Sequence, residues 1–431
     1  MGRKSPSENQ HIWEEAKRWC ATTTMNSRVP LAWGADALVT DYDGKKYIHL
    51  HSEVGVMNLG FGHARVANVL IEQIITGIMG AHHNDAPSKP SVDACKLLAT
   101  RAPVKKPAKV YLGNSGTEAN EAAIKACKAY RYHRGEKSLR AKAIYFFNSF
   151  HGRTLGSLPG TTSKPEVQQY PFLDHCDNEN SIYLPYPTRE HFPLLKEELK
   201  RIAWETVNYL LIELPCQGEG GIIPVDEEIL QYLYECVRLH DVIWISDCVQ
   251  CGIGRTGTLF GADCFPWLES DILTLGKALA GGIPIGATIF HERFDFQPGE
   301  HSSTFGGNPL ASSVIPVVIE EVERIIENNA VSEIESILYT RLNRMRHHSS
   351  VIDVRGRGAM WGIEFAAPEI QKRIIDIGEN ELVRHHTHGL KLLGAGKKTI
   401  RIMPPLTIEP KTLERAMDLF ALALKRYARL K

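Results

Sequence analysis

Short apolar runs that alternate with helical patterns constrain the fold of this chain more than any other feature of its sequence. Strand candidates rich in Val, Ile, Leu, Phe and Tyr lie at residues 109–112, 144–147, 210–212, 242–245, 272–275 and 285–290. Helical patterns at 118–134 and 227–240 separate several of these runs. Strands that are apolar on both faces and alternate with helices are typical of a mostly parallel α/β sheet.

The order of these patterns predicts three segments. Residues 71–310 are expected to form a large α/β domain around the sheet. Residues 311–431 begin with a long helix and then mix helices with short strands at 360–365 and 399–402, which indicates a smaller α+β domain. The N-terminal segment, residues 1–70, contains a strand pattern followed by the turn Asp43-Gly44, and we expect this hairpin to pack on the small domain.

Composition excludes several classes of function. The chain has 431 residues, and its 50 Lys and Arg balance its 50 Asp and Glu, so nothing indicates a nucleic-acid partner. No apolar run approaches the roughly 20 residues of a membrane span, and the N-terminus lacks the apolar core of a secretory signal. The nine cysteines are scattered, which favours reduced thiols in a cytoplasm. The lone pair Cys248 and Cys251 predicts packed thiols and no metal site.

Two polar residues, Asp247 and Lys277, each follow one of the apolar runs. The ends of parallel strands are where open α/β sheets place their ligands. A lysine held among apolar and glycine residues has its ammonium form disfavoured, so its neutral amine is available for a Schiff base. Pyridoxal phosphate is the obvious carbonyl partner, and a carboxylate beside its pyridine nitrogen would keep that nitrogen protonated. A lysine after a strand is, however, more often a solvated end residue.

Three further segments and one buried arginine could complete such a site. Residues 113–118 lie between a strand and a helix, where free N–H groups can hold a phosphate, although such turns are common without ligands. Residues 150–154 offer Phe150 as a face for a planar ring and Arg153 for a carboxylate; a buried Phe and a surface Arg are the alternative. The loop 301–309 suits an anion or is an ordinary loop. Arg401 in an apolar strand needs an anion, either a ligand carboxylate or a structural partner.

Together these segments resemble the class III aminotransferases, the family of the acetylornithine, ornithine and 4-aminobutyrate aminotransferases. The motifs that carry the resemblance are Gly55-Val56-Met57-Asn58, the segment 115–122, Phe150-His151-Gly152-Arg153-Thr154, Gln217-Gly218-Glu219-Gly220-Gly221, the segment 252–257, Leu275-Gly276-Lys277, the segment 303–309 and Arg355-Gly356-Arg357-Gly358. The resemblance covers nearly the whole chain. It implies a fold-type I enzyme that depends on pyridoxal phosphate (PLP), acts on amino acids and 2-oxo acids, and forms a homodimer or a dimer of dimers.

The resemblance also implies roles for individual residues. Lys277 and Asp247 are the catalytic residues: Lys277 forms the Schiff base and moves the substrate proton, and Asp247 pairs with the pyridine nitrogen. The cofactor-binding residues are Ser115, Gly116, Thr117, Phe150, His151, Asp247, Gln250, Lys277 and Thr304. Of these, Thr304 is expected to reach the phosphate of the neighbouring subunit. Arg153 and Arg401 resemble the two carboxylate-binding arginines of the family.

The chain departs from the family pattern at several positions. Cys248 replaces the usual glutamate after the aspartate, so a second carboxylate near the cofactor is missing. Leu214 stands before Pro215 where the family has glutamate, and the carboxylate has moved one position, to Glu213. We expect the family glutamate at this position to cover the arginine that corresponds to Arg401, and its displacement predicts an unpaired Arg401 that accepts α-carboxylates. Near the N-terminus, Glu53 stands where a glycine is common.

The function that these residues predict is transfer of an amino group from an ω-amino or basic amino acid to 2-oxoglutarate. Donors of the 4-aminobutyrate, ornithine, acetylornithine or lysine type fit the resemblance equally well. A racemase or epimerase of the same family is the alternative within this chemistry, and a catalytically altered member kept for binding is the alternative outside it. A dinucleotide-dependent oxidoreductase is the weakest reading, because the glycines at 252 and 254 lack the rest of that fingerprint.

Overall fold

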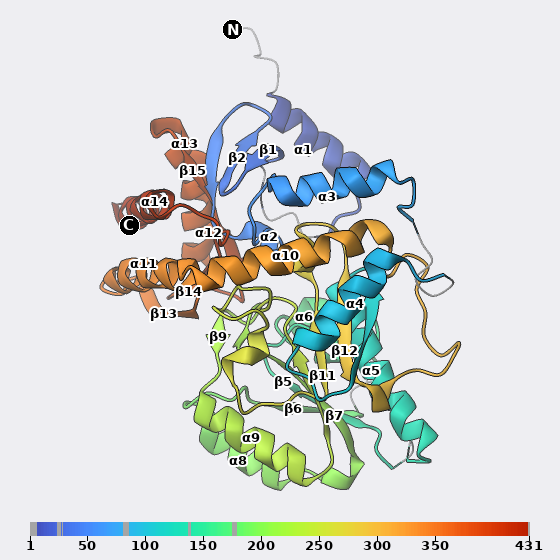
Figure 1. The fold of residues 1–431 in the computed structure, drawn as a ribbon. Helices are drawn as coiled ribbons and strands as arrows, with labels where there is room; N and C mark the ends of the chain where they lie inside the picture. Colours follow the sequence, from blue (N-terminus) through green and yellow to red (C-terminus); the bar gives the residue numbers. More distant parts are fainter. Residues whose placement is uncertain are drawn as a thin grey trace.

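The computed structural model describes residues 7–23, 27, 29–80, 86–136, 139–174 and 179–429. A seven-stranded sheet forms its centre, in the order β4-β12-β11-β10-β7-β5-β6. The strands are β4 (Ala108–Gly113), β12 (Gly286–His291), β11 (Ile272–Leu275), β10 (Ile243–Asp247), β7 (Val207–Glu213), β5 (Lys142–Phe146) and β6 (Ser181–Leu184). This sheet occupies the lower half of the molecule in Figure 1.

The sheet confirms the predicted mostly parallel architecture. All six predicted strands are present, and β6 is an additional strand at one edge. Neighbours from β11 to β6 run parallel, whereas β12 is antiparallel to both β11 and β4. Consequently the carboxyl ends of β5, β7, β10 and β11 meet at one edge of the sheet, where a ligand site is expected.

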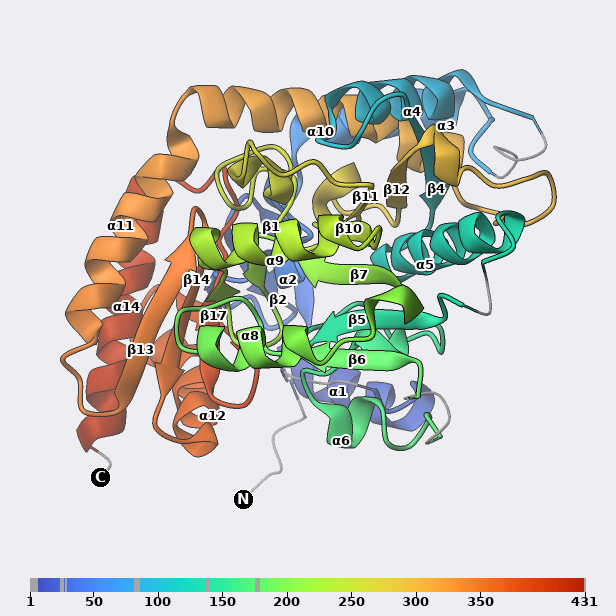
Figure 2. The same cartoon turned by 90° about the horizontal axis from the view of Figure 1, so that it is seen from below.

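Helices cover both faces of this sheet, and strand alternation decides which residues each face presents. On β7, Tyr209 and Leu211 belong to the apolar cluster under α5 (Gly116–His133). Their neighbours Leu210 and Ile212 belong to the larger cluster that includes residues of α8 (Phe192–Lys200) and α9 (Glu227–Leu239). Figure 2 shows α8 and α9 in front, beside the strands of this sheet. Because β7 is buried on both faces, its central residues 209–212 form a continuous apolar run.

Two smaller four-stranded sheets lie beside the large one. The first has the order β1-β2-β3-β15, and the second has the order β13-β14-β17-β16. Their strands are β1 (Leu31–Ala35), β2 (Leu38–Asp41), β3 (Lys46–His49), β15 (Gly389–Lys391), β13 (Val351–Arg357), β14 (Met360–Phe365), β17 (Thr399–Ile402) and β16 (Leu393–Ala395). The predicted hairpin is present as β2 and β3, and β3 pairs in parallel with β15. The domain boundaries at residues 70 and 310 stay a prediction.

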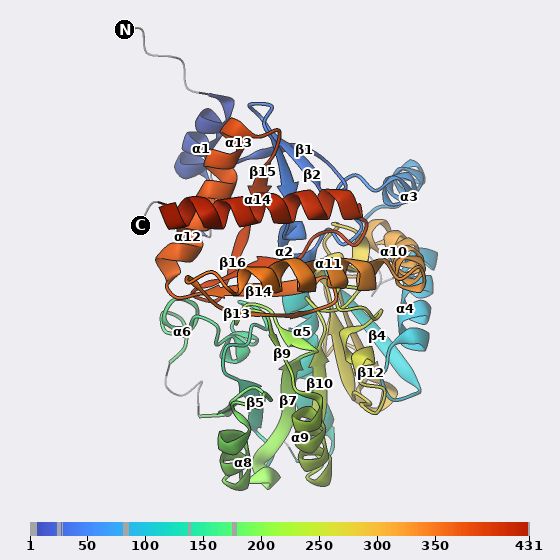
Figure 3. The same cartoon turned by 90° about the vertical axis from the view of Figure 1, so that its left-hand side faces the viewer.

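Long helices connect these layers. The predicted helix after Asn308 is α10 (Pro309–Glu327), and it crosses the molecule between the large sheet and the N-terminal strands (Figure 1). Helix α11 (Ala330–Met345) packs against β13 of the second small sheet, and α14 (Pro410–Arg429) packs on α11, as Figure 3 shows from the left-hand side of the view in Figure 1. The remaining helices and the short strand pair are α1 (Glu8–Trp19), α2 (Ser52–Gly55), α3 (Ala64–Ile75), α4 (Lys89–Arg101), α6 (Pro165–Gln168), α12 (Pro368–Asp376), α13 (Leu382–His385), β8 (Cys216–Gln217) and β9 (Ile223–Pro224).

The described helices include none that has both the length and the apolar character needed to cross a membrane. The segment in which a secretory signal would begin, residues 1–6, lies outside the described residues. The eight cysteines whose state the structure gives are all free thiols.

Candidate active site

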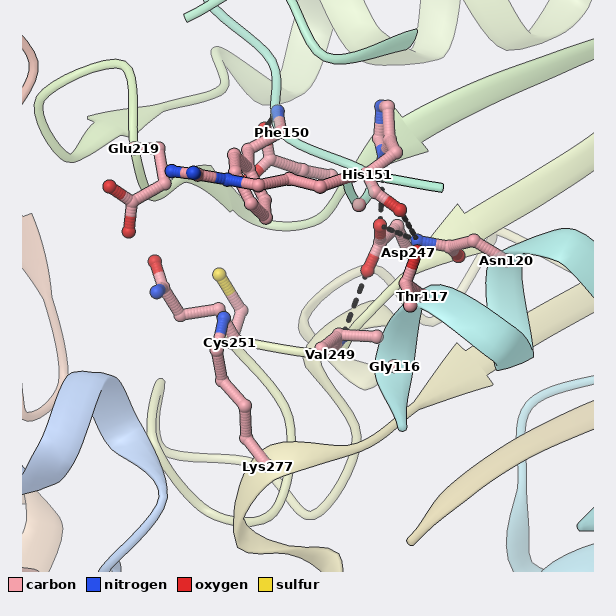
Figure 4. A pocket seen from close by; sticks show the side chains of 14 residues that line it. Gly116, Thr117, Asn120, Phe150, His151, Glu219, Asp247, Val249, Cys251 and Lys277 are labelled. Carbon is pink, nitrogen blue, oxygen red and sulfur yellow. Dashed lines mark hydrogen bonds and ion pairs between the residues drawn. The ribbon is translucent and has the colours of Figure 1, made fainter. Parts of the chain in front are cut away.

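A cavity of about 290 Å³ opens where the carboxyl ends of the parallel strands meet the start of α5 (Figure 4). Eight residues predicted from the sequence line it: Gly116, Thr117, Phe150, His151, Arg153, Asp247, Gln250 and Lys277. They come from segments far apart in the chain. The large sheet therefore brings together most of the residues that were singled out as functional.

Lys277 is separated from the end of β11 by one residue, Gly276, and begins a short 3-10 helix, η4 (Lys277–Ala280). Its backbone has φ of 45°, a left-handed conformation that costs a non-glycine residue about 1 to 2 kcal/mol. The side chain points into the cavity in Figure 4. Burial lowers the pKa of the Lys277 ammonium, and Arg401 acts in the same direction, whereas Glu219 and Asp247 oppose the shift. The net result favours the neutral amine, which is the nucleophilic form.

Asp247 ends β10 and is held in place by three donors. Its Oδ2 accepts hydrogen bonds from Asn120 Nδ2 at 2.8 Å and from His151 Nδ1 at 2.7 Å, and its Oδ1 accepts one from the Val249 N–H at 3.0 Å. The side chain of Asp247 is only 4% exposed. The carboxylate is thus fixed in the cavity wall, where it can compensate a positive charge on a bound ring.

Asn120 is a functional residue that the sequence analysis missed. It lies on α5 and is buried, and besides Asp247 it contacts the His151 carbonyl oxygen at 2.8 Å and the Thr274 hydroxyl at 2.7 Å. An asparagine within an otherwise Ala-rich helix was the available signal, because asparagine is unfavourable in a helix interior unless its amide is used.

The N-terminus of α5 forms another wall of the cavity. Ser115 is the N-cap, and its hydroxyl accepts a hydrogen bond from the Glu118 N–H at 3.3 Å. Gly116 and Thr117 follow and line the cavity, in the first turn, where backbone N–H groups have no partner within the helix. A Cβ on Gly116 would lie 2.5 Å from Val249 Cγ1, so only glycine allows this close approach. A phosphate group fits this end of the helix.

Phe150 and Arg153 lie on the opposite side of the cavity, after β5. The Arg153 guanidinium lies over the Phe150 ring, 5.8 Å from its centre. Arg153 is exposed although it lines the cavity, so a carboxylate that enters from solvent can reach it. The ring of His151 is buried, and its Nε2 has no hydrogen-bond partner among the described residues.

The expectation that Arg401 is unpaired is wrong. Both of its terminal nitrogens contact the carboxylate of Glu219, at 2.6 Å and 2.8 Å, and its Nε and Nη2 donate to the Gly394 carbonyl oxygen at 3.1 Å and 2.8 Å. Burial alone would raise the pKa of Glu219, but the charge of Arg401 outweighs it and holds that pKa at about 2. Glu219, rather than a residue at position 214, is the carboxylate that covers the arginine.

The substitutions Leu214 and Cys248 are core residues. Both are buried, belong to the main apolar cluster and are absent from the cavity wall. These two substitutions therefore affect the packing of the apolar core. Glu213, the carboxylate beside Leu214, does line the cavity. The predicted cofactor residue Thr304 is exposed in a loop and is not among the residues that line this cavity.

Glu53 occupies a backbone conformation that explains why a glycine is common there. The residues of α2 from Ser52 to Val54 have φ of 45°, 49° and 64°, the left-handed region. His49 holds this turn: its Nδ1 accepts from the Ser52 N–H at 3.1 Å, and its Nε2 lies 3.0 Å from Glu53 Oε1. The Ser52 hydroxyl also donates to the Met403 carbonyl oxygen at 2.8 Å.

His49, His51 and Glu53 form a cluster of the kind that can bind a metal, with ligand atoms within 4.8 Å of one another. The hydrogen bond from Ser52 argues against this use. Because His49 Nδ1 accepts a proton donor, the neutral ring carries its hydrogen on Nε2, directed at Glu53. A metal at Nε2 would need that nitrogen to be deprotonated.

Comparisons with known proteins show the family of this chain. A sequence profile described as Aminotransferase class-III matches residues 21–424. This chain belongs to the class III aminotransferases. The acetylornithine aminotransferase of Clostridium acetobutylicum is 32% identical over 95% of this chain and 100% of its own length. That of Aquifex aeolicus is 33% identical over 92% and 98%, respectively.

Solved structures show the same fold. A Bacillus anthracis aminotransferase superimposes with a TM-score of 0.86 at 22% identity, covering 99% of this chain and 100% of its own. The ornithine aminotransferase of Toxoplasma gondii superimposes with a TM-score of 0.84 at 24% identity, covering 99% and 97%. Another structure of that Toxoplasma enzyme is described with partial occupancy of PLP at its active site. The fold class inferred from the sequence, a fold-type I α/β transferase, is therefore confirmed.

As a class III aminotransferase, this chain is a PLP-dependent enzyme that acts on amino acids and 2-oxo acids. The cavity has the features that this cofactor requires. Lys277 offers an amine whose pKa is lowered by burial, Asp247 a fixed carboxylate for the ring nitrogen, and the start of α5 an anion site. Phe150 supplies an aromatic face.

Proposed function

We propose that this aminotransferase moves the ω-amino group of a basic amino acid, of the ornithine or N-acetylornithine type, to 2-oxoglutarate. The ion pair between Glu219 and Arg401 carries the proposal. A guanidinium covered by a carboxylate does not attract the α-carboxylate of a donor. The donor carboxylate then goes to the exposed Arg153, and the distant amino group is presented to Lys277. The named relatives, which are acetylornithine aminotransferases, support this choice.

When bound, PLP supplies the electron-withdrawing ring that makes the substrate C–H bond acidic. The residues of the chain position that chemistry. Lys277, whose pKa is lowered by burial, is the group that would hold and return the proton of the substrate carbon. Asp247, fixed by Asn120 and His151, supplies the negative charge opposite the ring nitrogen. Phe150 and the first turn of α5 would hold the ring and the phosphate, and Gln250 would bind the ring hydroxyl.

The second half of the reaction requires Arg401 to be uncovered. The acceptor 2-oxoglutarate has two carboxylates, so it can compete with Glu219 for Arg401 while Arg153 holds its other end. A basic donor has one free carboxylate and leaves the ion pair closed. The same cavity can thus accept two substrates of different charge in turn.

Assembly and location belong to the same proposal. A homodimer, or a dimer of dimers, would bring the exposed Thr304 of one subunit to the phosphate site of the other. A cytoplasmic location remains our prediction from the scattered cysteines. Some relatives differ, since the acetylornithine aminotransferase of Saccharomyces cerevisiae, 33% identical to this chain, is named as mitochondrial.

A donor panel tests the proposal. The purified enzyme is mixed with N-acetylornithine, ornithine, 4-aminobutyrate, lysine, alanine or leucine, first without and then with 2-oxoglutarate. The ω-amino donors should bleach the visible absorption of the bound cofactor, and 2-oxoglutarate should restore it while glutamate forms. Equal use of alanine and leucine would contradict the proposal. Loss of optical activity of a donor without any acceptor would instead identify a racemase.

A further inference from the structure

Glu213 is a buried carboxyl in the cavity wall that the proposed mechanism leaves without a role. It is the last residue of β7 and is 5% exposed. Its register partner on the neighbouring strand β10 is Asp247. Burying a carboxyl group is costly unless its oxygens have hydrogen-bond partners, so the contacts of Glu213 indicate what it does.

Each oxygen of Glu213 accepts a hydrogen bond from a different part of the site. Oε2 accepts from the Phe150 N–H and Oε1 from the Gly218 N–H, both at 3.1 Å. Phe150 carries the aromatic ring of the cavity wall, and Gly218 directly precedes Glu219, the partner of Arg401. One side chain therefore holds the backbone of the aromatic wall and the backbone of the loop that covers the arginine.

The backbone of the loop at Gly218 has little room to shift. A Cβ on Gly218 would lie 1.5 Å from Gln250 Oε1, so the loop runs directly against a residue of the cavity wall. A Cβ on Gly220 would lie 2.7 Å from the Asn148 carbonyl oxygen, close to the segment that carries Phe150. A small shift of the Gly218 backbone would therefore move Glu219 and Gln250 together.

The surroundings of Glu213 also change its pKa. Burial, and then the neighbouring Asp247, raise the pKa of Glu213 to about 8, although its two N–H donors and Lys277 act against this shift. The other titratable groups packed against it are Tyr186, whose hydroxyl donates to the Glu213 carbonyl oxygen at 2.7 Å, and the Cys251 thiol. The two backbone N–H donors thus act against burial and hold both oxygens of this carboxyl beside Asp247.

We propose that Glu213 is a positioning residue for amino transfer, which fixes the aromatic wall at Phe150 and the Glu219 loop in one rigid frame beside Asp247. The inference rests on the proposed function of the site and adds a residue to it. It also explains how the chain functions with leucine at position 214. The carboxyl at 213 faces the cavity, while Leu214 packs into the core.

Glu213→Gln is the direct test. An amide has one acceptor oxygen and a donor nitrogen, so one of the two backbone N–H groups loses its acceptor and meets another donor. We expect kcat to fall by ~10- to 100-fold, because a misplaced ring and loop lose reactive geometry. We also expect a changed visible circular dichroism band of the bound cofactor, and a smaller ratio of kcat/KM for ornithine over alanine. A role in folding alone would change neither the band nor the ratio.

Asp263→Asn is the matched control. Asp263 is a half-buried carboxyl that accepts a hydrogen bond from the Phe260 N–H at 2.8 Å. Burial raises the pKa of Asp263 to about 6. Asp263 does not line the cavity. This variant should lose thermal stability while it keeps the dichroism band and the donor ratio of the wild type.

The outcomes separate the two proposals. A folded Glu213→Gln enzyme with the wild-type band and donor ratio would overturn the role of Glu213. If that variant does not fold, Glu213→Asp gives the same comparison, because its side chain is shorter by one methylene group. A wild-type dichroism band and donor ratio in Glu213→Asp would also overturn the role of Glu213. If the wild type itself does not use basic donors, the proposed function fails. The dichroism comparison, which needs only bound PLP, still tests Glu213 in that case.

Discussion

Glu219 and Arg401 form a two-armed ion pair between residues 182 positions apart in the sequence, with N–O distances of 2.6 Å and 2.8 Å. The Arg401 side chain is 2% exposed, whereas that of Glu219 is 25% exposed. The arginine is therefore fixed in its strand, and the glutamate is the partner that has room to move. In the proposed function, substrate selection by charge depends on which anion occupies this guanidinium.

Glu219→Gln should weaken this selection. A neutral amide leaves Arg401 free to bind an α-carboxylate, so kcat/KM for alanine or glutamate as donor should rise by ~10-fold or more relative to ornithine. Steady-state assays with the donor panel measure this ratio. Glu320→Gln, which removes an exposed partner of Arg65, is the control and should leave the ratio unchanged. An unaltered ratio in Glu219→Gln would rule out the ion pair as the selective element.

Lys277→Ala should abolish the covalent link to the cofactor and lower turnover by ~100- to 10,000-fold, because the group that moves the proton is gone. Mass spectrometry after borohydride reduction detects the link in the wild type. Lys89→Ala, which changes an 84% exposed lysine, should stay fully labelled. Labelling that persists in Lys277→Ala would place the reactive amine elsewhere.

Asp247→Asn should retain the cofactor through its phosphate but lose at least ~100-fold in kcat, since the ring nitrogen no longer faces a negative charge. The new amide also has only one acceptor oxygen, so either the Val249 N–H or the donors Asn120 and His151 would meet an NH₂ group instead of an acceptor. Stoichiometry of bound PLP and single-turnover rates separate binding from chemistry. Turnover close to that of the wild type would show that Asp247 is structural.

Thr304→Val should weaken PLP binding by ~10-fold through loss of a phosphate contact across the subunit interface. Mixed dimers provide the decisive measurement. A Lys277→Ala subunit still supplies Thr304 to its neighbour, so mixing it with Thr304→Val subunits should restore one intact site per mixed dimer. Activity of the mixture that does not exceed the sum of the parents would place Thr304 outside the neighbouring site.

The two cavity carboxyls should respond to pH in different ranges. The pKa of Glu213 is raised to about 8, so the unfolded chain ionises first, and its contribution to folding stability declines between about pH 4.5 and pH 8. The melting temperature of the apoenzyme relative to that of Glu213→Gln should fall over this range. The pKa of Glu219 is held at about 2, so donor selection should not change between pH 6 and 9 through Glu219. A constant melting difference would show that Glu213 does not titrate in this range.

Much of the large sheet follows from its apolar runs, because strands buried on both faces leave a continuous signal. The exceptions are informative. The edge strand β6 is only partly buried, so its four residues lack that signal. The antiparallel direction of β12 could not be predicted, since an apolar run has the same pattern in both directions, and only the path of the connecting chain decides how it pairs.

The site, like the sheet, contains residues that could be predicted from the sequence and a contact that could not. Asp247 and Lys277 were predictable because the first ends a buried strand and the second lies just beyond one, and strand ends converge at one edge of the sheet. The partner of Arg401 was not predictable. Whether Glu213 or Glu219 reaches it depends on the fold of the loop 217–221 and on a strand far along the chain. Sequence distance gives no information about that encounter.

The contact between the Ser52 hydroxyl and the Met403 carbonyl joins residues 351 positions apart, and it lies beside the turn that packs on the Lys277 segment. This has a consequence for synthesis of the chain on the ribosome. The lysine and its aspartate emerge while β17, which carries Arg401, is still untranslated. Lys277 and Asp247 are therefore synthesised before Arg401, so under the proposed function selection among carboxylates begins only after β17 is made.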